Sequence, residues 1–304
     1  MTSPAPQGSR PATARRLAGR RLGRKAANLV FTGLSSAAAT IALTFLALIL
    51  WTLLQKGFSG INLDVFTRDT AAAGTLHGGL RNAIVGSLVI CAIAMAISVV
   101  VGILAGTWLA ELGGESRYGH VVRFLNDVLL SAPSILVGLA VYILLVKHGL
   151  HTYSPLAGGV ALALLATPVV TRTTEDILRL QPHALREAGS ALGTPNWLVI
   201  RKVVWRAAGG GLLTGALLGF ARIAGETAPL LQTALGDTSS GDWSHPIHAL
   251  THPIAALPLV IYNNALSSDD GLVSIGWVGA LLIAFAVLII NIAGRILAAR
   301  AARQ

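Results

Sequence analysis

Residues 209–227 read GGGLLTGALLGFARIAGET, an apolar run that carries evenly spaced glycines and ends with two charged residues. In an α-helix each residue turns the chain by about 100°. Five positions therefore share one arc of about 80°: Gly211, Gly215, Gly219, Arg222 and Glu226. Glycine at every fourth position lets a second helix approach closely, so we expect this face to be buried against protein.

Arg222 and Glu226 stand in a run that is otherwise apolar enough to lie in a membrane. A charge at the centre of a bilayer costs about 2.5 kcal/mol or more, so its presence requires a reason. One interpretation is a structural ion pair within the helix, because residues four apart can meet. The other is a polar site on a translocation path, where the arginine offers paired donors to an oxyanion. The residues alone leave both interpretations open.

The composition of the whole chain places it in a bilayer. Of its 304 residues, 54% are hydrophobic and 12% are charged, and the mean hydropathy is +0.68. A soluble globular protein carries about 25% charged residues, so this chain cannot cover a soluble surface. The high apolar fraction equally excludes a disordered protein.

Six apolar stretches predict an all-α membrane protein, since about 20 helical residues cross the hydrocarbon core. They cover residues 29–54, 83–110, 124–146, 155–171, 207–231 and 272–294. None alternates with a period of two, which excludes a membrane β-barrel. The first stretch is too long for a cleaved signal peptide, so we expect it to remain as a helix. Residues 1–26 are expected to form a disordered basic tail that precedes a transmembrane domain over 27–304.

The basic residues predict the orientation of the spans. Of the 23 lysines and arginines, 18 fall before span one, after spans two, four and six, and four fall in the alternate segments. Cytoplasmic segments carry the excess of positive charge, so both termini are expected in the cytoplasm. The net charge of +10 does not indicate nucleic-acid binding, because the basic residues lie in blocks between apolar runs.

The chain offers little for metal binding or redox chemistry. Cys91 is its one cysteine, so there is no intramolecular disulfide and no cysteine metal site. Three histidines lie in an imperfect repeat over residues 244–257, SHPIHAL followed by THPIAAL. We expect Pro246 and Pro253 to break any helix that would align them, so the segment is interpreted as a partly interfacial loop without a metal.

A second charged cluster begins where the fourth span ends. It consists of Arg172, Glu175, Asp176 and Arg179, whose spacing predicts a paired ladder on one helical face. A solvated helix end is the alternative, and Arg172 is the best functional candidate because it is closest to the bilayer. In the third span Asn126 and Asp127 lie near the inner boundary, where we expect Arg123 to pair with Asp127.

Residues 177–206 form the longest loop on the side predicted to be cytoplasmic. Its centre reads QPHALREAGSALGTPNW (181–197). Pro182 suits the start of a short helix and Gly193 the left-handed residue that ends it. Thr194 then caps a second helix that Pro195 opens. Such a surface helix has no core of its own, so it is expected to dock on a partner.

The loop resembles the cytoplasmic signature of the inner-membrane permeases of ABC importers. That signature is Glu-Ala-Ala with glycine four residues after the second alanine, and here it reads Glu187-Ala188-Gly189 with Gly193. In the family it forms the coupling helix that docks on the ATPase subunits. Gly189 departs from the pattern and lowers helix propensity by about 1 kcal/mol relative to alanine.

Four further motifs resemble the phosphate permeases of the PstA type within this family. They are GLRNAIVG (79–86), APSILVGL (132–139), TRTTED (171–176) and RIAGETAPLL (222–231). The resemblance covers residues 29–297 and implies a type I importer permease (MetI-like) fold in the bacterial cytoplasmic membrane. It also implies a sister permease, two ATP-binding subunits and an extracytoplasmic protein that delivers inorganic phosphate.

The expected function is therefore that of a transport subunit, not of an enzyme. No Gly-x-x-x-x-Gly-Lys-Ser/Thr loop occurs in the sequence, so ATP is used by a partner and this chain needs no cofactor. The candidates for the substrate pathway are Arg222, Glu226, Arg172 and Glu175. A permease for another oxyanion, a sugar or another small solute is the alternative; it should lack the Arg222–Glu226 pair.

Overall fold

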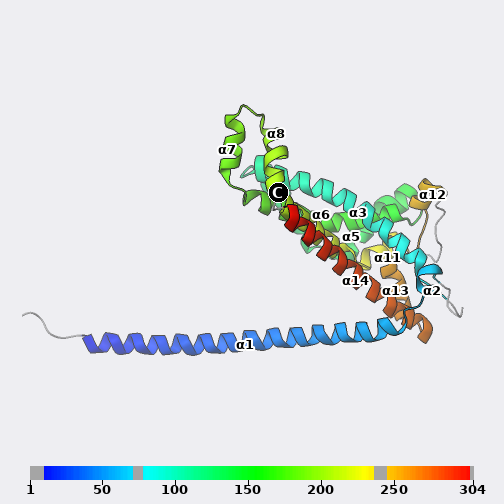
Figure 1. Cartoon of the computed structure of the whole chain (residues 1–304), viewed down its shortest axis with the longest axis horizontal. Helices are drawn as coiled ribbons and strands as arrows, with labels where there is room; N and C mark the ends of the chain where they lie inside the picture. Colours follow the sequence, from blue (N-terminus) through cyan, green and yellow to red (C-terminus); the bar gives the residue numbers. More distant parts are fainter. Residues whose placement is uncertain (1–9, 71–77, 236–244, 302–304) are drawn as a thin grey trace, which may run out of the picture. The chain divides into compact units, whose positions relative to one another are not determined.

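The structure is a computed structural model that describes residues 10–70, 78–235 and 245–301, and every regular element in these ranges is helical (Figure 1). In chain order the elements are α1 (Arg10–Ser59), α2 (Asp64–Thr67), α3 (Arg81–Trp108), η1 (Leu109–Gly113), α4 (Arg117–Ser131), α5 (Ser134–Val141), η2 (Tyr142–Leu150), α6 (Pro155–Arg179), α7 (His183–Ala191), α8 (Asn196–Val199), η3 (Ile200–Val204), α9 (Trp205–Ala207), α10 (Gly209–Ile223), α11 (Ala228–Thr233), α12 (Pro246–Thr251), α13 (Leu257–Ala265) and α14 (Asp270–Ala301). The η elements are π-helical turns. The expected all-α class is confirmed.

Four helices of the described residues are long and apolar enough to cross a membrane. They are Asn28–Ser59, Arg81–Gly113, Pro155–Arg179 and Asp270–Ala298. Two bent helix pairs raise the number to six if each pair counts as one span. The six expected spans thus all have a helical counterpart, while the side on which the termini lie stays a prediction.

The third expected span is not one helix. Arg117–Ser131 and Ser134–Leu150 meet at an angle of 105°. Pro133 causes the break, since proline has no N–H to donate and pushes the residue before it out of the helical region. Ala132 accordingly has an extended ψ of 134°. The prediction of a continuous helix over 124–146 was wrong because the apolar run continues across this proline.

The fifth expected span is also interrupted. The helix predicted over 207–231 ends at Ile223, and the chain resumes a helix only at Ala228. On its other side, α10 bends by 76° from the segment Asn196–Ala207. The interruption contains Gly225, a residue that favours turns, and Pro229 lies in the first turn of the helix that follows.

The chain divides into two compact units, Met1–Gln55 and Lys56–Gln304. In the first unit the described residues belong to α1, which begins at Arg10. Residues 1–9 of the expected tail lie outside the described residues, while residues 10–26, for which disorder was also expected, form the first turns of α1.

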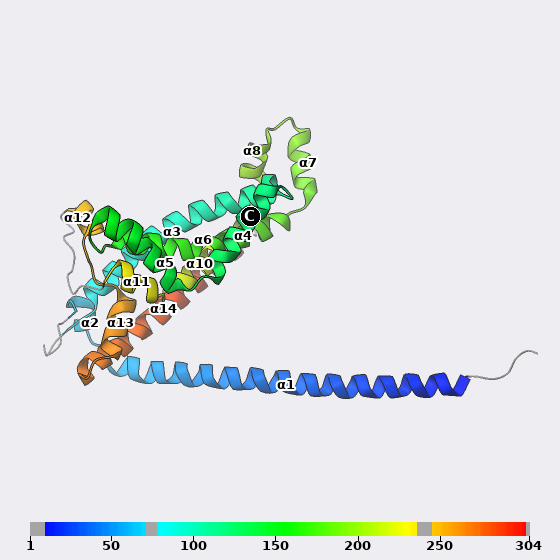
Figure 2. The ribbon, with the colours of Figure 1, turned by 180° about the vertical axis from the view of Figure 1, so that it is seen from behind.

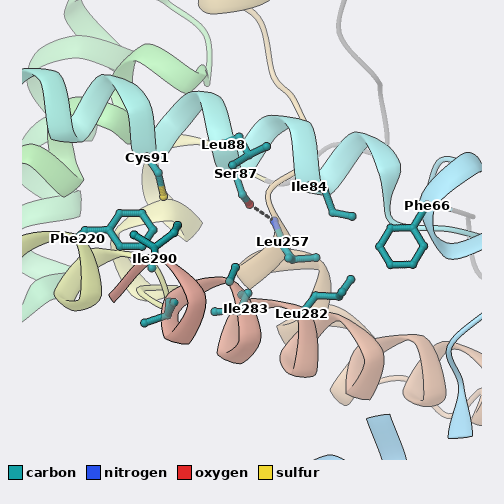
Figure 3. Close-up of a pocket in the computed structure, with 13 residues that line it drawn as sticks. Phe66, Ile84, Ser87, Leu88, Cys91, Phe220, Leu257, Leu282, Ile283 and Ile290 are labelled. Carbon is teal, nitrogen blue, oxygen red and sulfur yellow. Dashed lines mark hydrogen bonds between the residues drawn. The ribbon is translucent and has the colours of Figure 1, made fainter. Parts of the chain in front are cut away.

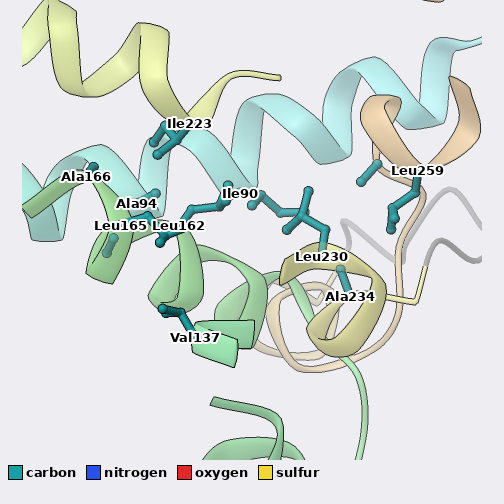
Figure 4. Close-up of a cluster of buried hydrophobic side chains, with 12 residues drawn as sticks. Ile90, Ala94, Val137, Leu162, Leu165, Ala166, Ile223, Leu230, Ala234 and Leu259 are labelled. Carbon is teal, nitrogen blue, oxygen red and sulfur yellow. The ribbon is translucent and has the colours of Figure 1, made fainter. Parts of the chain in front are cut away.

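The second unit is built around α3 and α6, which share the most extensive helix contact. α10 packs on α6, and α14 packs on both α10 and α13. Ile90 of α3, Leu162 of α6 and Ile223 of α10 meet in one buried cluster (Figure 4). Leu230 of α11 and Leu259 of α13 extend it. Because Ile223 is the last residue of α10 and Leu230 lies in α11, this cluster packs on both sides of the break in the fifth span.

The loop over 177–206 forms a helical hairpin. Figures 1 and 2 show α7 and α8 side by side, beyond the ends of α3 and α6. Gly193 has a φ of +71°, the left-handed conformation expected from its place after α7. The second helix begins at Asn196 with Pro195 at the cap position, one residue later than expected.

The segment after residue 244 contains a helix where none was expected. α12 begins at Pro246, because proline is tolerated in a first helical turn. The rings of His248 and His252 stack with centroids 3.5 Å apart. Ser244, the first residue of the expected repeat, lies outside the described residues.

Candidate functional site

α10 packs against α6 through its three evenly spaced glycines. A Cβ atom added to any of them would crowd an α6 side chain: 2.6 Å from Ile177 at Gly211, 3.1 Å from Thr173 at Gly215 and 2.8 Å from Val170 at Gly219. Carbon atoms in favourable contact lie about 3.5–4.0 Å apart, so a larger residue at these positions would force the facing α6 side chains to shift. The two helices run antiparallel, since positions advance along α10 as they recede along α6.

Arg222 and Glu226 form an ion pair at the end of α10. The helix was expected to continue through Glu226, but it ends at Ile223, and the Glu226 N–H donates to the Ile223 carbonyl over 3.1 Å. The pair forms across this turn. The Arg222 side chain is 46% exposed and that of Glu226 is 15% exposed. The guanidinium is therefore accessible, while the carboxylate that binds it is mostly buried.

The turn after Arg222 leads directly into the contact between the two interrupted spans. α11 packs on α5, the segment that follows the proline break in the third span. A Cβ added to Gly138 of α5 would lie 2.6 Å from the Cα of Pro229. Val137 of α5 belongs to the same buried cluster as Ile223 and Leu230 (Figure 4). The Arg222–Glu226 pair is therefore flanked by a close backbone crossing.

Glu175 lies at the centre of a buried ion network. Its side chain is 3% exposed and accepts from Arg123 Nε over 2.8 Å. Arg179 Nη2 lies 2.9 Å from the same carboxylate oxygen, Oε1. Because 52 residues separate Arg123 and Glu175 in the sequence, local spacing could not reveal their contact. The expected pairing of Arg123 with Asp127 was wrong.

The charged cluster on α6 is split between two environments. Arg172 pairs with Asp176 over 3.5 Å, and both side chains are more than half exposed. Glu175 lies at the protein-facing edge of the same face and takes part in the network just described. Both pairs expected of the ladder form, Arg172 with Asp176 and Arg179 with Glu175. They differ in burial, because residues that share an arc of about 100° can still lie at the edge between the protein interior and its surface.

The residues of the loop signature lie on α7 and just beyond it. Glu187 and Ala188 are exposed. Gly189 faces α8, where an added Cβ would lie 2.7 Å from Val199 Cγ1. The glycine that departs from the usual Glu-Ala-Ala pattern thus has a packing reason. Leu192 and Trp197, near the tip of the hairpin, expose 85% and 62% of their surface.

Sequence reasoning missed one residue of this loop. Arg186 of α7 makes a two-pronged ion pair with Glu111 of η1, with Nε–Oε2 and Nη2–Oε1 distances of 2.8 and 2.5 Å. The hydrogen bond from Arg186 to Glu111 raises the pKa of the guanidinium, although burial opposes this. Its partner lies 75 residues away in the sequence, so local spacing could not predict this ion pair.

An apolar pocket of about 240 Å³ lies between α3, α10 and α14 (Figure 3). Its lining includes Phe220 and Ala224 but not Arg222. The one hydroxyl in the lining, that of Ser87, accepts the Leu257 N–H over 2.6 Å. A pocket lined almost entirely by apolar side chains, with no charged group, does not suit an oxyanion. Among the residues described here, no three metal-ligating side chains converge either.

The comparisons with known sequences agree with one another. Residues 98–303 match the family described as "Binding-protein-dependent transport system inner membrane component". The "Phosphate transport system permease protein PstA" of Haemophilus influenzae is 47% identical over 90% of this chain and 94% of that protein. A "Probable phosphate transport system permease protein PstA" of Methanocaldococcus jannaschii is 38% identical over 83% and 89%.

A solved structure shows the same fold. The chain is similar to the inward-facing MetNI methionine ABC transporter, with a TM-score of 0.60 over 73% of this chain and 95% of that chain. The sequence identity is 18%, so this likeness concerns the MetI-like fold alone.

Proposed function

Because this chain belongs to the family of binding-protein-dependent inner-membrane transport components, as a permease of the PstA type, we propose that it forms part of a phosphate translocation pathway. The observation that carries the proposal is the Arg222–Glu226 pair at an interrupted membrane span. The names of its relatives support phosphate as the solute. Interrupted spans are where transporters expose polar groups to a substrate.

Arg222 is the proposed contact for the phosphate oxygens. Its guanidinium is half exposed and sits at the end of α10, where it offers paired donors to an oxyanion. Glu226 holds the guanidinium in place, and its negative charge keeps the anion from binding too tightly to leave. The ion pair thus lowers the electrostatic barrier to the passage of an anion, and it does so without binding the anion so tightly that release becomes slow.

Arg172 is the proposed second contact on the pathway. In the antiparallel contact of α6 with α10, Val170 faces Gly219 and Thr173 faces Gly215. Arg172 therefore lies beside the stretch of α10 between these two glycines, about one and a half helical turns before Arg222. Its half-exposed side chain can receive an anion passing along the helix. Glu175 contributes from the buried side, where it fixes Arg123 and Arg179.

We propose that energy reaches this chain through α7. Two ATP-binding subunits would dock on the exposed surface formed by Glu187, Ala188 and the hairpin tip, with Gly193 supplying the turn. A sister permease would complete the pathway, and a phosphate-binding protein would deliver the solute from outside the bacterial cytoplasmic membrane. ATP binding then alternates access to the Arg222 site between the two sides.

Uptake of labelled phosphate tests the proposal. Cells that lack this gene are complemented with the wild-type chain, and uptake is measured at low external phosphate with unlabelled sulfate, molybdate or phosphate as competitor. We expect restored uptake that only phosphate suppresses. A parallel assay with labelled sulfate and labelled molybdate gives the contrary outcome: restored uptake of either anion in place of phosphate would assign the chain to another oxyanion.

A further inference from the structure

Arg186 joins three elements at the base of the α7–α8 hairpin. Besides its two bonds to Glu111 of η1, it donates from Nη1 to the Gln181 carbonyl over 3.0 Å and from Nη2 to the Leu178 carbonyl over 2.9 Å. The side chains of Arg186 and Glu111 are 22% and 7% exposed. One arginine thus ties α7 to the end of α6 and to the turn that follows α3.

The attachment of α7 to the rest of the unit is mainly polar. No residue of α7 is buried in the structure described here, so apolar packing cannot hold this helix firmly. A bidentate arginine–carboxylate pair fixes both distance and direction, because its two parallel bonds require the two planar groups to stay aligned. The Arg186–Glu111 pair therefore gives α7 a direct contact of fixed geometry with η1.

The same turn is held from the other side by α4. Arg123 donates from Nη2 to the Gly114 carbonyl over 2.9 Å, while its Nε binds the buried Glu175. η1 connects α3 with the short link to α4, and the chain then continues through the Pro133 break into α5. η1 therefore lies between α7 and the interrupted span that crosses α11 next to Arg222.

We propose that Arg186 and Glu111 form a mechanical joint through which a displacement of α7 reaches η1, α4 and the α5–α11 crossing. They are positioning residues, because neither lies on the proposed pathway. The proposal rests on the proposed function, in which α7 receives the movement of an ATPase. It assigns the transmission to one ion pair and not to the docking surface as a whole.

The test uses the complete transporter, with its ATPase and phosphate-binding protein, reconstituted in liposomes. The variants are Glu111→Gln, Arg186→Gln and the double variant, which leaves no unpaired buried charge. The readout is the phosphate transported per ATP hydrolysed. Arg68→Gln is the matched control, since it removes an arginine from an ion pair with Asp64 that lies outside α7, η1 and the Glu175 network.

We expect each single variant to lower transport per ATP about tenfold, within the usual range of coupling between sites. The double variant should lose no more than either single variant, because the two residues act as one unit. Arg68→Gln should keep the wild-type ratio.

Three results overturn this inference. A wild-type ratio in the double variant shows that the pair transmits nothing. Additive losses show two independent supports. Release of the ATPase from all three variants shows that the pair shapes the docking surface. The proposed function fails separately, if the wild-type complex hydrolyses ATP but moves no phosphate.

Discussion

Replacing Gly138 with alanine tests the backbone crossing beside the Arg222–Glu226 pair. The new Cβ would lie 2.6 Å from the Cα of Pro229 and 3.0 Å from its carbonyl oxygen. Carbon atoms prefer separations of about 3.5–4.0 Å, so α5 and α11 must separate by about 1 Å. Both obstacles are backbone atoms, which cannot rotate away as a flexible side chain would.

The magnitude follows from two opposing effects. Overpacking of this kind destabilises proteins by about 1–3 kcal/mol, and the higher helix propensity of alanine returns up to about 1 kcal/mol. We therefore expect a net loss of about 1–2 kcal/mol in the free energy of unfolding. Because α11 follows Glu226 directly, the phosphate uptake rate should fall as well.

The assay is thermal unfolding of the purified protein in detergent, followed by tryptophan fluorescence, alongside uptake in cells. Gly209→Ala is the matched control, since an added Cβ there meets nothing within 4 Å. We expect Gly138→Ala to lower the unfolding midpoint while Gly209→Ala leaves it unchanged or raises it. Equal midpoints for the two variants would refute the close crossing of α5 and α11.

Two further predictions concern buried polar groups. Ser87→Ala removes the acceptor for the buried Leu257 N–H and should cost about 1–3 kcal/mol of stability, measured by the same thermal unfolding; an unchanged midpoint would mean that this N–H has another partner. Glu175→Gln leaves Arg123 without its carboxylate and should cost about 3–5 kcal/mol, whereas the exposed Asp176→Asn should change stability by less than about 1 kcal/mol. Equal losses would contradict the buried network.

The membrane class, the helical spans and the glycine face of α10 follow from composition and spacing. All three depend on local patterns: the apolar composition, apolar runs long enough to cross a bilayer, and Gly211, Gly215 and Gly219 one turn apart. The breaks at Pro133 and after Ile223 were missed for the same reason. Hydropathy continues across them, so a pattern of apolar residues alone does not register the change in backbone direction.

Whether an ion pair could be predicted depends on how far apart its two residues lie in the sequence. Residues four apart, such as Arg222 and Glu226, can be paired from helical geometry. Arg123 meets Glu175, and Arg186 meets Glu111, only when η1, α4, α6 and α7 pack together. Helix spacing carries no information about such pairs, so the sequence alone could not identify the centre of the network or the joint beneath α7.

The central claim is that the Arg222 guanidinium lies on the phosphate pathway. The most direct measurement is the initial rate of phosphate uptake by Arg222→Ala, after its assembly with the ATPase has been verified. Arg68→Ala is the matched control, because Arg68 is half exposed and pairs with Asp64 at the same spacing of four residues. Losing a charged hydrogen bond of about 1.5–3 kcal/mol predicts a fall of about ten- to a hundredfold for Arg222→Ala, with no change for Arg68→Ala. Wild-type uptake by Arg222→Ala would contradict the claim and leave the Arg222–Glu226 pair a structural feature of the helix end.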